Sequence, residues 1–313
     1  MTGNNVDVDA YFKRIGYADG HLANLQTLGG IVRRHTETIA FENLNPLSGR
    51  PVNLEPAALQ RKIVEEHRGG YCFEQNLLLR NVLQQLGFQV TGLAARVMWN
   101  LPETVVLPRT HMLLLVQLDN EPYVVDVGFG GQVLTGVLKL RADIEQPTPH
   151  EPFRFIHPAT TFIMQAKVRS EWRSLYQFDL QEQVYEDYEM ANWYTSTQPT
   201  SRFVTNLIAA RTAPDRRYAL FNKELAIHHL HGDTERDTLS TAEQLRETLE
   251  HDFLLRVPRT PEVDAALARI AAGDERSHPS RFKTLPTANF AKVSPCARRT
   301  IGCSQESPWS CVE

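Results

Sequence analysis

The most reactive residue type in the body of this chain is a single cysteine, Cys72. It lies in the segment Arg-Gly-Gly-Tyr-Cys-Phe-Glu-Gln-Asn at 68–76, where two glycines permit a sharp turn. The apolar spacing of the residues that follow predicts a long helix that begins at about Cys72. A helix N-terminus presents unpaired N–H groups and a positive dipole end, which stabilise a thiolate or an oxyanion. Cys72 is therefore a candidate nucleophile, and the alternative is a small buried apolar residue.

A nucleophilic cysteine needs a base, and His111 stands out among the 11 histidines. It begins the apolar segment 111–118, so a predicted strand would hold its ring in one direction. The next apolar segment, 123–127, contains Asp126. A carboxylate among apolar residues is costly unless it is paired. These residues predict a Cys-His-Asp set in which Asp126 orients His111.

The length of the turn between these two segments decides whether His111 and Asp126 meet. If 119–120 form a two-residue hairpin turn, Asp126 falls opposite Leu113. His111 is then diagonal to Asp126 on the same face, at roughly 7–8 Å between backbones, which an imidazole can span. A four-residue loop would put Asp126 opposite Leu115 and out of contact. The triad therefore requires the tight turn.

Two other groups of residues give weaker indications. The segment Gly-Phe-Gly-Gly at 128–131 would let the backbone approach a phosphate, although it lacks the lysine and the spacing of a P-loop. His228, His229 and His231 form a local cluster. A metal site is conceivable there, but no cysteine or acidic partner stands at ligand spacing, so the sequence favours a surface or strand-end role.

Helices are expected to dominate the first ninety residues. Apolar residues at helical spacing predict helices over 22–35, over 55–67 and from about 72 to 86. Asn53 is placed to cap the second helix, and Gly87 suits the position after the end of the third.

After Gly87 the pattern changes to short β-branched or aromatic segments separated by turn residues, which predict a sandwich or a barrel. A polar and aromatic stretch at 183–194 predicts a connecting helix. A helix is expected to begin at Ser240, with Glu243 completing a capping box, and another after Thr260 and Pro261, ending before Gly273. The predicted strands are 88–98, 111–118, 123–127, 153–157, 161–168, 172–180, 207–211 and 218–221.

Composition narrows the class of protein. The 313 residues are 42% hydrophobic and 22% charged, with a net charge of -4, which is typical of a globular protein and argues against nucleic-acid or anionic-membrane binding. The N-terminus does not resemble a secretory signal and the apolar runs are too short to span a bilayer, so we expect a cytoplasmic protein. Cys296, Cys303 and Cys311 crowd the C-terminus, and no disulfide framework or CxxC metal site is expected.

Three motifs together resemble those of the arylamine N-acetyltransferase family. They are the segment 68–76, Pro-Arg-Thr-His-Met at 108–112, and Val-Asp-Val-Gly-Phe-Gly-Gly at 125–131. The resemblance extends to further motifs and covers about residues 7 to 273: Tyr11-Phe12, Arg-Ile-Gly-Tyr at 14–17, Ala-Phe-Glu-Asn-Leu at 40–44, and residues of 192–203 that include Asn192-Trp193-Tyr194 and Phe203.

The resemblance implies an α+β fold with a papain-like cysteine-enzyme core. Its parts would be a helical bundle at 1–90, a β-barrel with a connecting helix at 91–200 and a C-terminal α/β lid at 201–275. Residues 276–313 have no counterpart in the family pattern, and their composition predicts a disordered tail.

The resemblance also implies roles for the site residues. Cys72 would accept the acyl group, His111 would be its base and Asp126 would orient the imidazole. The aromatic residues that match the acceptor cleft are Phe41, Phe129 and Phe203, although core packing is the alternative for each. The candidates for contact with CoA are Thr110, Gly128, Gly130 and Gly131, and Arg14 and Glu42 match a family ion pair near the cysteine.

The expected activity is acetyl transfer from acetyl-CoA, without a metal, to the nitrogen of small arylamines, arylhydrazines or arylhydroxylamines. A double displacement through acetyl-cysteine predicts ping-pong kinetics. One alternative is a papain- or transglutaminase-like cysteine hydrolase, or an amide synthase that uses another thioester donor. Another is a binding module that keeps the fold without the chemistry. The sequence does not indicate an oligomeric state.

Overall fold

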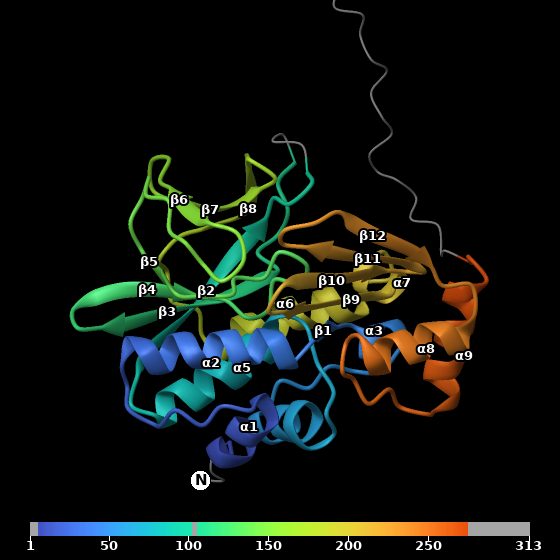
Figure 1. The fold of residues 1–313 in the computed structure, drawn as a ribbon. Coiled ribbons are helices and arrows are strands. Elements are labelled where there is room, and N and C mark those ends of the chain that lie inside the picture. The colour runs from blue at the N-terminus through green and yellow to red at the C-terminus, as the bar shows by residue number, and fades with distance from the viewer. Residues whose placement is uncertain (1–5, 102–104, 275–313) are drawn as a thin grey trace, which may run out of the picture. The chain divides into compact units, whose positions relative to one another are not determined.

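The computed structural model describes residues 6–101 and 105–274. The expected tail at 276–313, with its three cysteines, lies outside these ranges. Helices from the N-terminal part of the chain lie against a seven-stranded sheet, and a five-stranded sheet packs with the C-terminal helices (Figure 1). No helix in the described ranges is long and apolar enough to cross a membrane.

The N-terminal helices confirm the predicted helical character of this part. They are α1 (Val8–Ile15), α2 (Leu25–Thr38), α3 (Leu44–Leu47), α4 (Pro56–Leu59), which continues into the π-helix η1 (Gln60–Glu65), and α5 (Cys72–Gln85). The predicted cap for the helix at 55–67 is wrong. The Asn53 side chain accepts a hydrogen bond from Glu55 N at 2.8 Å, before the helix begins. Pro56 then takes the first helical position, where its missing N–H needs no partner.

The seven-stranded sheet is a nearly closed antiparallel barrel, one of the two forms that the strand pattern predicted. Its strands follow the order β5-β4-β3-β2-β8-β7-β6. Isolated bridges join Ala142 to Phe155 and Gln146 to Phe153, which brings the segment after β5 against β6. The strands are β2 (Gln89–Val97), β3 (His111–Leu118), β4 (Glu121–Val125), β5 (Leu138–Lys139), β6 (Phe153–Ile156), β7 (Phe162–Val168) and β8 (Glu171–Phe178).

The five-stranded sheet has the order β1-β9-β10-β11-β12. The sequence pattern predicted β9 and β10 but missed β11 and β12. Strand β12 gave no signal because its residues are mostly charged and exposed and have no apolar period. Phe41 of β1 lies opposite Ala210 of β9, so a segment of the N-terminal part completes this sheet. The strands are β1 (Phe41–Glu42), β9 (Ile208–Ala213), β10 (Arg216–Phe221), β11 (Glu224–His229) and β12 (Thr234–Thr238).

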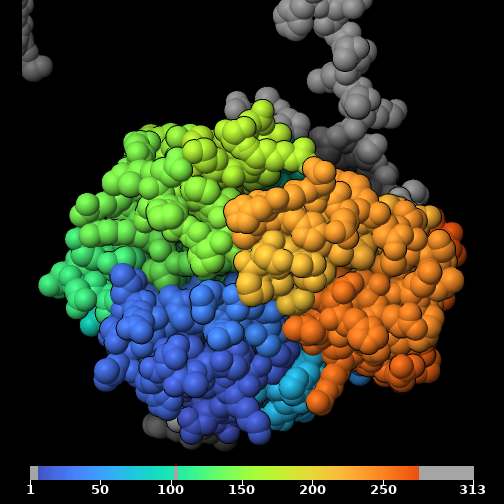
Figure 2. All heavy atoms as spheres, in the orientation of Figure 1, coloured from blue at the N-terminus to red at the C-terminus, as the bar shows by residue number. Residues whose placement is uncertain are grey.

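The remaining helices are α6 (Tyr185–Thr197), which is the predicted connecting helix, α7 (Arg202–Thr205), α8 (Ala242–His251) and α9 (Pro261–Ala271). Helix α9 begins after Thr260 and ends before Gly273, which has φ 71, as expected. The predicted capping box of α8 is wrong by one residue. Thr241 and Gln244 form it: the Gln244 N–H donates to Thr241 Oγ1 at 3.1 Å, and the Thr241 N–H donates to Gln244 Oε1 at 3.1 Å. Figure 2 shows α8 and α9 and the neighbouring sheet as one orange surface beside the green barrel.

The hairpin between β3 and β4 has the tight turn that the triad requires. Leu118 lies opposite Glu121, which leaves 119–120 as the turn. Both turn residues have positive φ, 52 for Asp119 and 60 for Asn120. This conformation matches the twist of the flanking strands and suits Asp and Asn. The register predicted from the sequence is therefore confirmed.

Asn120→Val should destabilise the protein by about 1–2 kcal/mol, because a β-branched residue resists the left-handed conformation. Asn120→Gly is the matched control and should be at least as stable as the wild type, since glycine adopts positive φ without a steric cost. Urea unfolding followed by circular dichroism measures the difference. Equal stability of the two variants would contradict the turn.

Candidate active site

Cys72 occupies the first position of α5, as the glycines before it suggested. Tyr71 is the N-cap residue, and its N–H donates to Glu74 Oε2 at 3.1 Å, which closes the first turn. The Cys72 side chain is buried, and its Sγ lies 3.6 Å from the carbonyl oxygen of Thr110. It is thus a buried thiol that is also held at a helix N-terminus beside the start of β3.

His111 and Asp126 meet as the hairpin register predicted. His111 Nε2 donates to Asp126 Oδ2 at 2.7 Å, since a carboxylate only accepts. Burial alone would lower the pKa of His111, but Asp126 and Cys72 raise it. Burial alone would likewise raise the pKa of Asp126, which His111 and hydrogen bonds from Asn76 and Gly128 keep below its ordinary value. The arrangement thus favours a protonated imidazole beside an ionised carboxylate.

Sequence reasoning missed Asn76, which ties the cysteine helix to this pair. Its Nδ2 donates to Asp126 Oδ1 at 3.0 Å and to the Met112 carbonyl at 2.8 Å. Its Oδ1 accepts from Val127 N at 3.1 Å. Cys72 and Asn76 are four residues apart and therefore share one helix face, and that spacing was the available signal.

Gly128 is needed because the loop after β4 passes very close to α5. A Cβ atom at Gly128 would lie 2.6 Å from Cys72 Cα and 2.8 Å from Asn76 Nδ2. The Gly128 N–H donates to Asp126 Oδ1 at 2.9 Å. The glycine thus allows the loop, the helix and the carboxylate to meet.

Aromatic rings surround the imidazole. The Phe129 ring centroid lies 5.2 Å from that of His111, in an edge-on arrangement, and the Tyr176 centroid lies at 4.7 Å. Tyr176 is fully buried and comes from β8. Patterning identified its strand but not its contact with His111, which depends on barrel closure.

Most of the predicted site residues line one cavity of about 430 Å³. Asp126 is the exception, because it is fully buried behind His111. Residues of the five-stranded sheet that the sequence did not indicate line the same cavity, among them Ala210, Leu220 and Arg236. The predicted site residues on its wall are Cys72, His111, Thr110, Gly128, Gly130, Gly131, Phe41, Phe129 and Phe203.

Arg217 of β10, in the five-stranded sheet, holds the glycine-rich loop at 128–131 in place. Its Nη2 lies 2.8 Å from Glu151 Oε1 and donates to the Val133 carbonyl at 3.0 Å. Its Nη1 donates to the Gly131 carbonyl at 3.4 Å. Because Arg217 is buried, one planar fork connects the five-stranded sheet to the loop and to the barrel.

A second group of buried charges lies next to the cysteine helix. Glu42 Oε1 accepts from Arg68 Nη2 at 2.6 Å and lies 3.6 Å from Lys62 Nζ. Lys62 also bonds Glu74 at 2.6 Å. The ion pair expected between Arg14 and Glu42 is wrong, because Arg14 Nε donates instead to the Ile63 carbonyl of the π-helix at 3.1 Å. Arg68 is the partner that neutralises Glu42.

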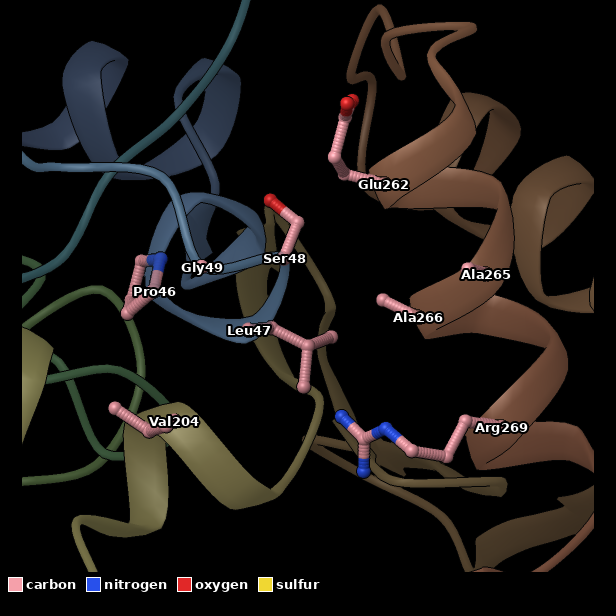
Figure 3. A pocket seen from close by; sticks show the side chains of 9 residues that line it. All are labelled: Pro46, Leu47, Ser48, Gly49, Val204, Glu262, Ala265, Ala266 and Arg269. Carbon is pink, nitrogen blue, oxygen red and sulfur yellow. The ribbon is translucent and has the colours of Figure 1, made fainter. Parts of the chain in front are cut away.

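A smaller cavity of about 370 Å³ lies between α3, α7 and α9 (Figure 3). Its lining includes Ser48, Glu262 and Arg269, and no cysteine or histidine of the described part of the chain lies on it. Arg269 Nη1 donates to the Thr205 carbonyl at 3.2 Å, so α9 supports the end of α7, the helix that carries Phe203. This cavity lacks the groups needed for acyl transfer.

The histidine cluster has local partners. His228 Nδ1 lies 3.0 Å from Thr234 Oγ1, and His229 Nε2 lies 2.7 Å from Glu235 Oε1. His229 is the last residue of β11. Within 6–101 and 105–274, no group of three or more His, Cys, Asp or Glu side chains is placed to hold a metal ion.

Known proteins are similar to this chain over most of its length. A family model described as N-acetyltransferase matches residues 24–262. The arylamine N-acetyltransferase of Mycobacterium tuberculosis is 44% identical over 269 residues, which are 85% of this chain and 95% of that protein. The Salmonella typhimurium arylamine N-acetyltransferase / N-hydroxyarylamine O-acetyltransferase is 35% identical over 277 residues, 88% of this chain and 98% of that protein.

A solved structure extends the likeness to the fold. The Mycobacterium marinum arylamine N-acetyltransferase in complex with CoA has a TM-score of 0.81 to this chain at 39% identity, over 84% of this chain and 99% of that one. The mixed α/β fold with its nearly closed barrel and the matches together define an acyltransferase. The chain belongs to the arylamine N-acetyltransferase family, which confirms the resemblance inferred from its motifs.

The Glu42 cluster makes a prediction about acid stability. Burial alone would raise the pKa of Glu42, but Arg68 and Lys62 lower it from 4.5 to about 2. A carboxyl whose pKa is lower in the folded state stabilises the fold above its unfolded pKa, and this contribution is lost as pH falls through the folded value. The free energy of unfolding should therefore fall between about pH 5 and pH 2 through this group.

Glu42→Gln should flatten that part of the pH dependence and lower stability at pH 7, because Arg68 loses its charged partner. Urea unfolding at several pH values from 3 to 7 measures both effects. If the free energy of unfolding changed with pH in the same way in the variant and the wild type, Glu42 would not be the group that loses its charge in this range.

Proposed function

We propose that Cys72 accepts the acetyl group of acetyl-CoA and passes it to the nitrogen of an arylamine, arylhydrazine or arylhydroxylamine. One arrangement carries this proposal. The buried Asp126 accepts a hydrogen bond from His111, and His111 lies beside Cys72 on the wall of a mostly apolar cavity. A thiolate held beside an imidazolium is the activated form of such a nucleophile.

In the first half-reaction, the Cys72 thiolate attacks the thioester carbonyl carbon and a tetrahedral intermediate forms. Unpaired N–H groups at the start of α5 would stabilise its oxyanion. When the intermediate collapses, the carbon–sulfur bond to CoA breaks and His111 gives its proton to the leaving thiolate. The products are acetyl-Cys72, free CoA and a neutral His111.

In the second half-reaction, the acceptor nitrogen attacks the acetyl carbonyl and His111 takes the proton that the nitrogen loses. The bond to Cys72 sulfur then breaks, which releases the amide and restores the thiolate and imidazolium pair. Asp126 stabilises the charged imidazole in both halves. One site thus serves two substrates in turn, which gives ping-pong kinetics.

The wall of the cavity supports these substrate classes. Phe41, Phe129 and Phe203 offer flat apolar surfaces to an aromatic ring. Thr110 and the glycines 128, 130 and 131 are proposed to contact CoA, and the Mycobacterium marinum relative has been solved with CoA bound. The name of the Salmonella typhimurium relative includes N-hydroxyarylamine O-acetyltransferase, which supports N-hydroxyarylamines as acceptors, although that name describes transfer to their oxygen and not to their nitrogen.

We further propose the architecture that the family resemblance implied. The helices of 1–90 and the barrel of 91–200 would form a papain-like core, because the cysteine begins a helix of one part and the histidine a strand of the other. Residues 201–275 would act as a lid, since β9 to β12 contribute to the cavity wall. A cytoplasmic location remains a prediction.

A cysteine hydrolase or an amide synthase with another donor has the same three residues and is the second candidate. The match to relatives named as acetyltransferases over 85% and more of the chain favours acetyl transfer. A binding module is disfavoured because all three positions of the triad hold competent residue types at contact geometry.

Intact-mass measurement after incubation with acetyl-CoA should show one acetyl adduct, and Cys72→Ala should show none. The adduct should disappear when an arylamine is added. Asn120→Gly, which leaves the cavity intact, is the control. A wild-type enzyme that stays unmodified would overturn the proposed function.

Arg217→Gln should raise the KM for acetyl-CoA by about tenfold, because the glycine-rich loop loses a charge-assisted anchor. Steady-state kinetics with a fixed acceptor measures it. The neighbouring Arg216→Gln is the matched control, since Arg216 pairs with the exposed Asp215 and bonds no part of the loop. The same KM in both variants would mean that the loop does not position CoA.

A further inference from the structure

One buried polar side chain of the cysteine helix takes no part in the proposed chemistry. Gln75 lies three residues after Cys72 on α5 and is fully buried. Its Nε2 donates to the Gly70 carbonyl at 2.7 Å and to the Ala40 carbonyl at 3.2 Å. One amide group of the cysteine helix thus binds two segments, which are the turn that leads into the helix and the residue that precedes β1.

These two segments also contact each other beside the site. The Gly70 carbonyl accepts from Glu42 N at 3.0 Å, and Phe41 forms an isolated bridge with Gly70. Phe41 lines the cavity that contains Cys72. The Gln75 amide therefore ties the turn before the nucleophile to a strand that forms part of the cavity wall.

His35 of α2 holds the Gln75 amide in this orientation. Two carbonyl oxygens face the amide nitrogen, so the amide oxygen is the atom that faces the imidazole, with 3.1 Å between Gln75 Oε1 and His35 Nε2. An amide oxygen only accepts, so His35 carries its proton on Nε2. Burial lowers the pKa of His35 from 6.5 to about 3, so the ring is neutral and Nδ1 carries no proton.

Tyr11 of α1 completes the series of hydrogen bonds. Its hydroxyl lies 2.7 Å from His35 Nδ1 and donates to that nitrogen, because Nδ1 carries no proton. Both side chains are fully buried. Every donor thus points the same way, from Tyr11 through His35 and Gln75 to the two carbonyls. Without the phenol, the imidazole proton is free to move to Nδ1, and the amide loses the donor that fixes its direction.

We propose that Gln75 is a positioning residue for Cys72, and that the imidazole and the phenol behind it act through its amide. By holding the turn from which Cys72 emerges, the amide fixes the place of the thiol beside His111. A displaced thiolate loses rate in all its reactions, because small errors of position are costly. The inference rests on the proposed function only in taking Cys72 as the reacting group.

The test follows the rate of Cys72 alkylation by iodoacetamide as a function of pH, which needs no acyl donor. Gln75→Met keeps the length of the side chain and removes both donors. It should slow labelling at pH 6 by about tenfold and move the labelling profile to higher pH, because the thiolate loses part of its stabilisation by His111. Tyr11→Phe, which removes one oxygen atom, should slow labelling by about threefold.

The double variant distinguishes one series of contacts from independent ones. If the phenol acts through the amide, Tyr11→Phe has no further effect once Gln75→Met is in place. The double variant should therefore label at the rate of Gln75→Met alone. A double variant in which the two effects multiply would overturn the proposal.

Thr36→Val is the matched control, because Thr36 is buried on the same helix as His35 and its Oγ1 donates to the Arg33 carbonyl of that helix at 3.0 Å. It should lower the free energy of unfolding and leave the labelling rate unchanged. If Gln75→Met behaves in the same way, its role is merely structural and the proposal fails.

Should Gln75→Met not fold, Tyr11→Phe decides alone, and a labelling profile identical to that of the wild type would overturn the proposal. The acetyl adduct on Cys72 tests the proposed function separately. A wild-type protein that labels fast but forms no adduct would remove the acetyl transfer and leave the positioning role intact.

Discussion

The buried carboxylate of Asp126 is the constraint on which the rest of the site depends. An ionised group with no exposure to water is tolerated only when donors surround it. Here the donors come from three separate places: the β3 residue His111, Asn76 of α5 and the Gly128 backbone. Satisfying one carboxylate therefore brings the cysteine helix, the hairpin and the glycine-rich loop to a common point.

The same need to satisfy buried charge organises the surroundings of the cysteine. Glu42 requires Arg68, and that pair lies beside the turn that leads into α5. Arg217 requires Glu151, and its remaining donors hold the carbonyls of the loop that faces CoA in our proposal. Removing one partner of such a pair leaves an uncompensated charge, so these contacts define a single arrangement of the cavity wall.

Local signals in the sequence were sufficient for the parts of the site that are near in the chain. The turn residues 119–120 set the hairpin register, and the register placed His111 beside Asp126. Contacts between distant segments were not accessible in this way. The pairing of β1 with β9 and the contact of Tyr176 with His111 both join segments more than sixty residues apart in the chain. Strand β12 was missed because its residues are mostly charged and exposed and have no apolar period.

The central claim is that Asp126, through His111, holds Cys72 in its reactive state. The most direct measurement is the rate of Cys72 alkylation by iodoacetamide at pH 6, in the wild type and in Asp126→Asn with its fold checked by circular dichroism. Our account predicts fast labelling of the wild type and a fall of about tenfold or more in the variant. Equal rates in the two proteins would contradict it.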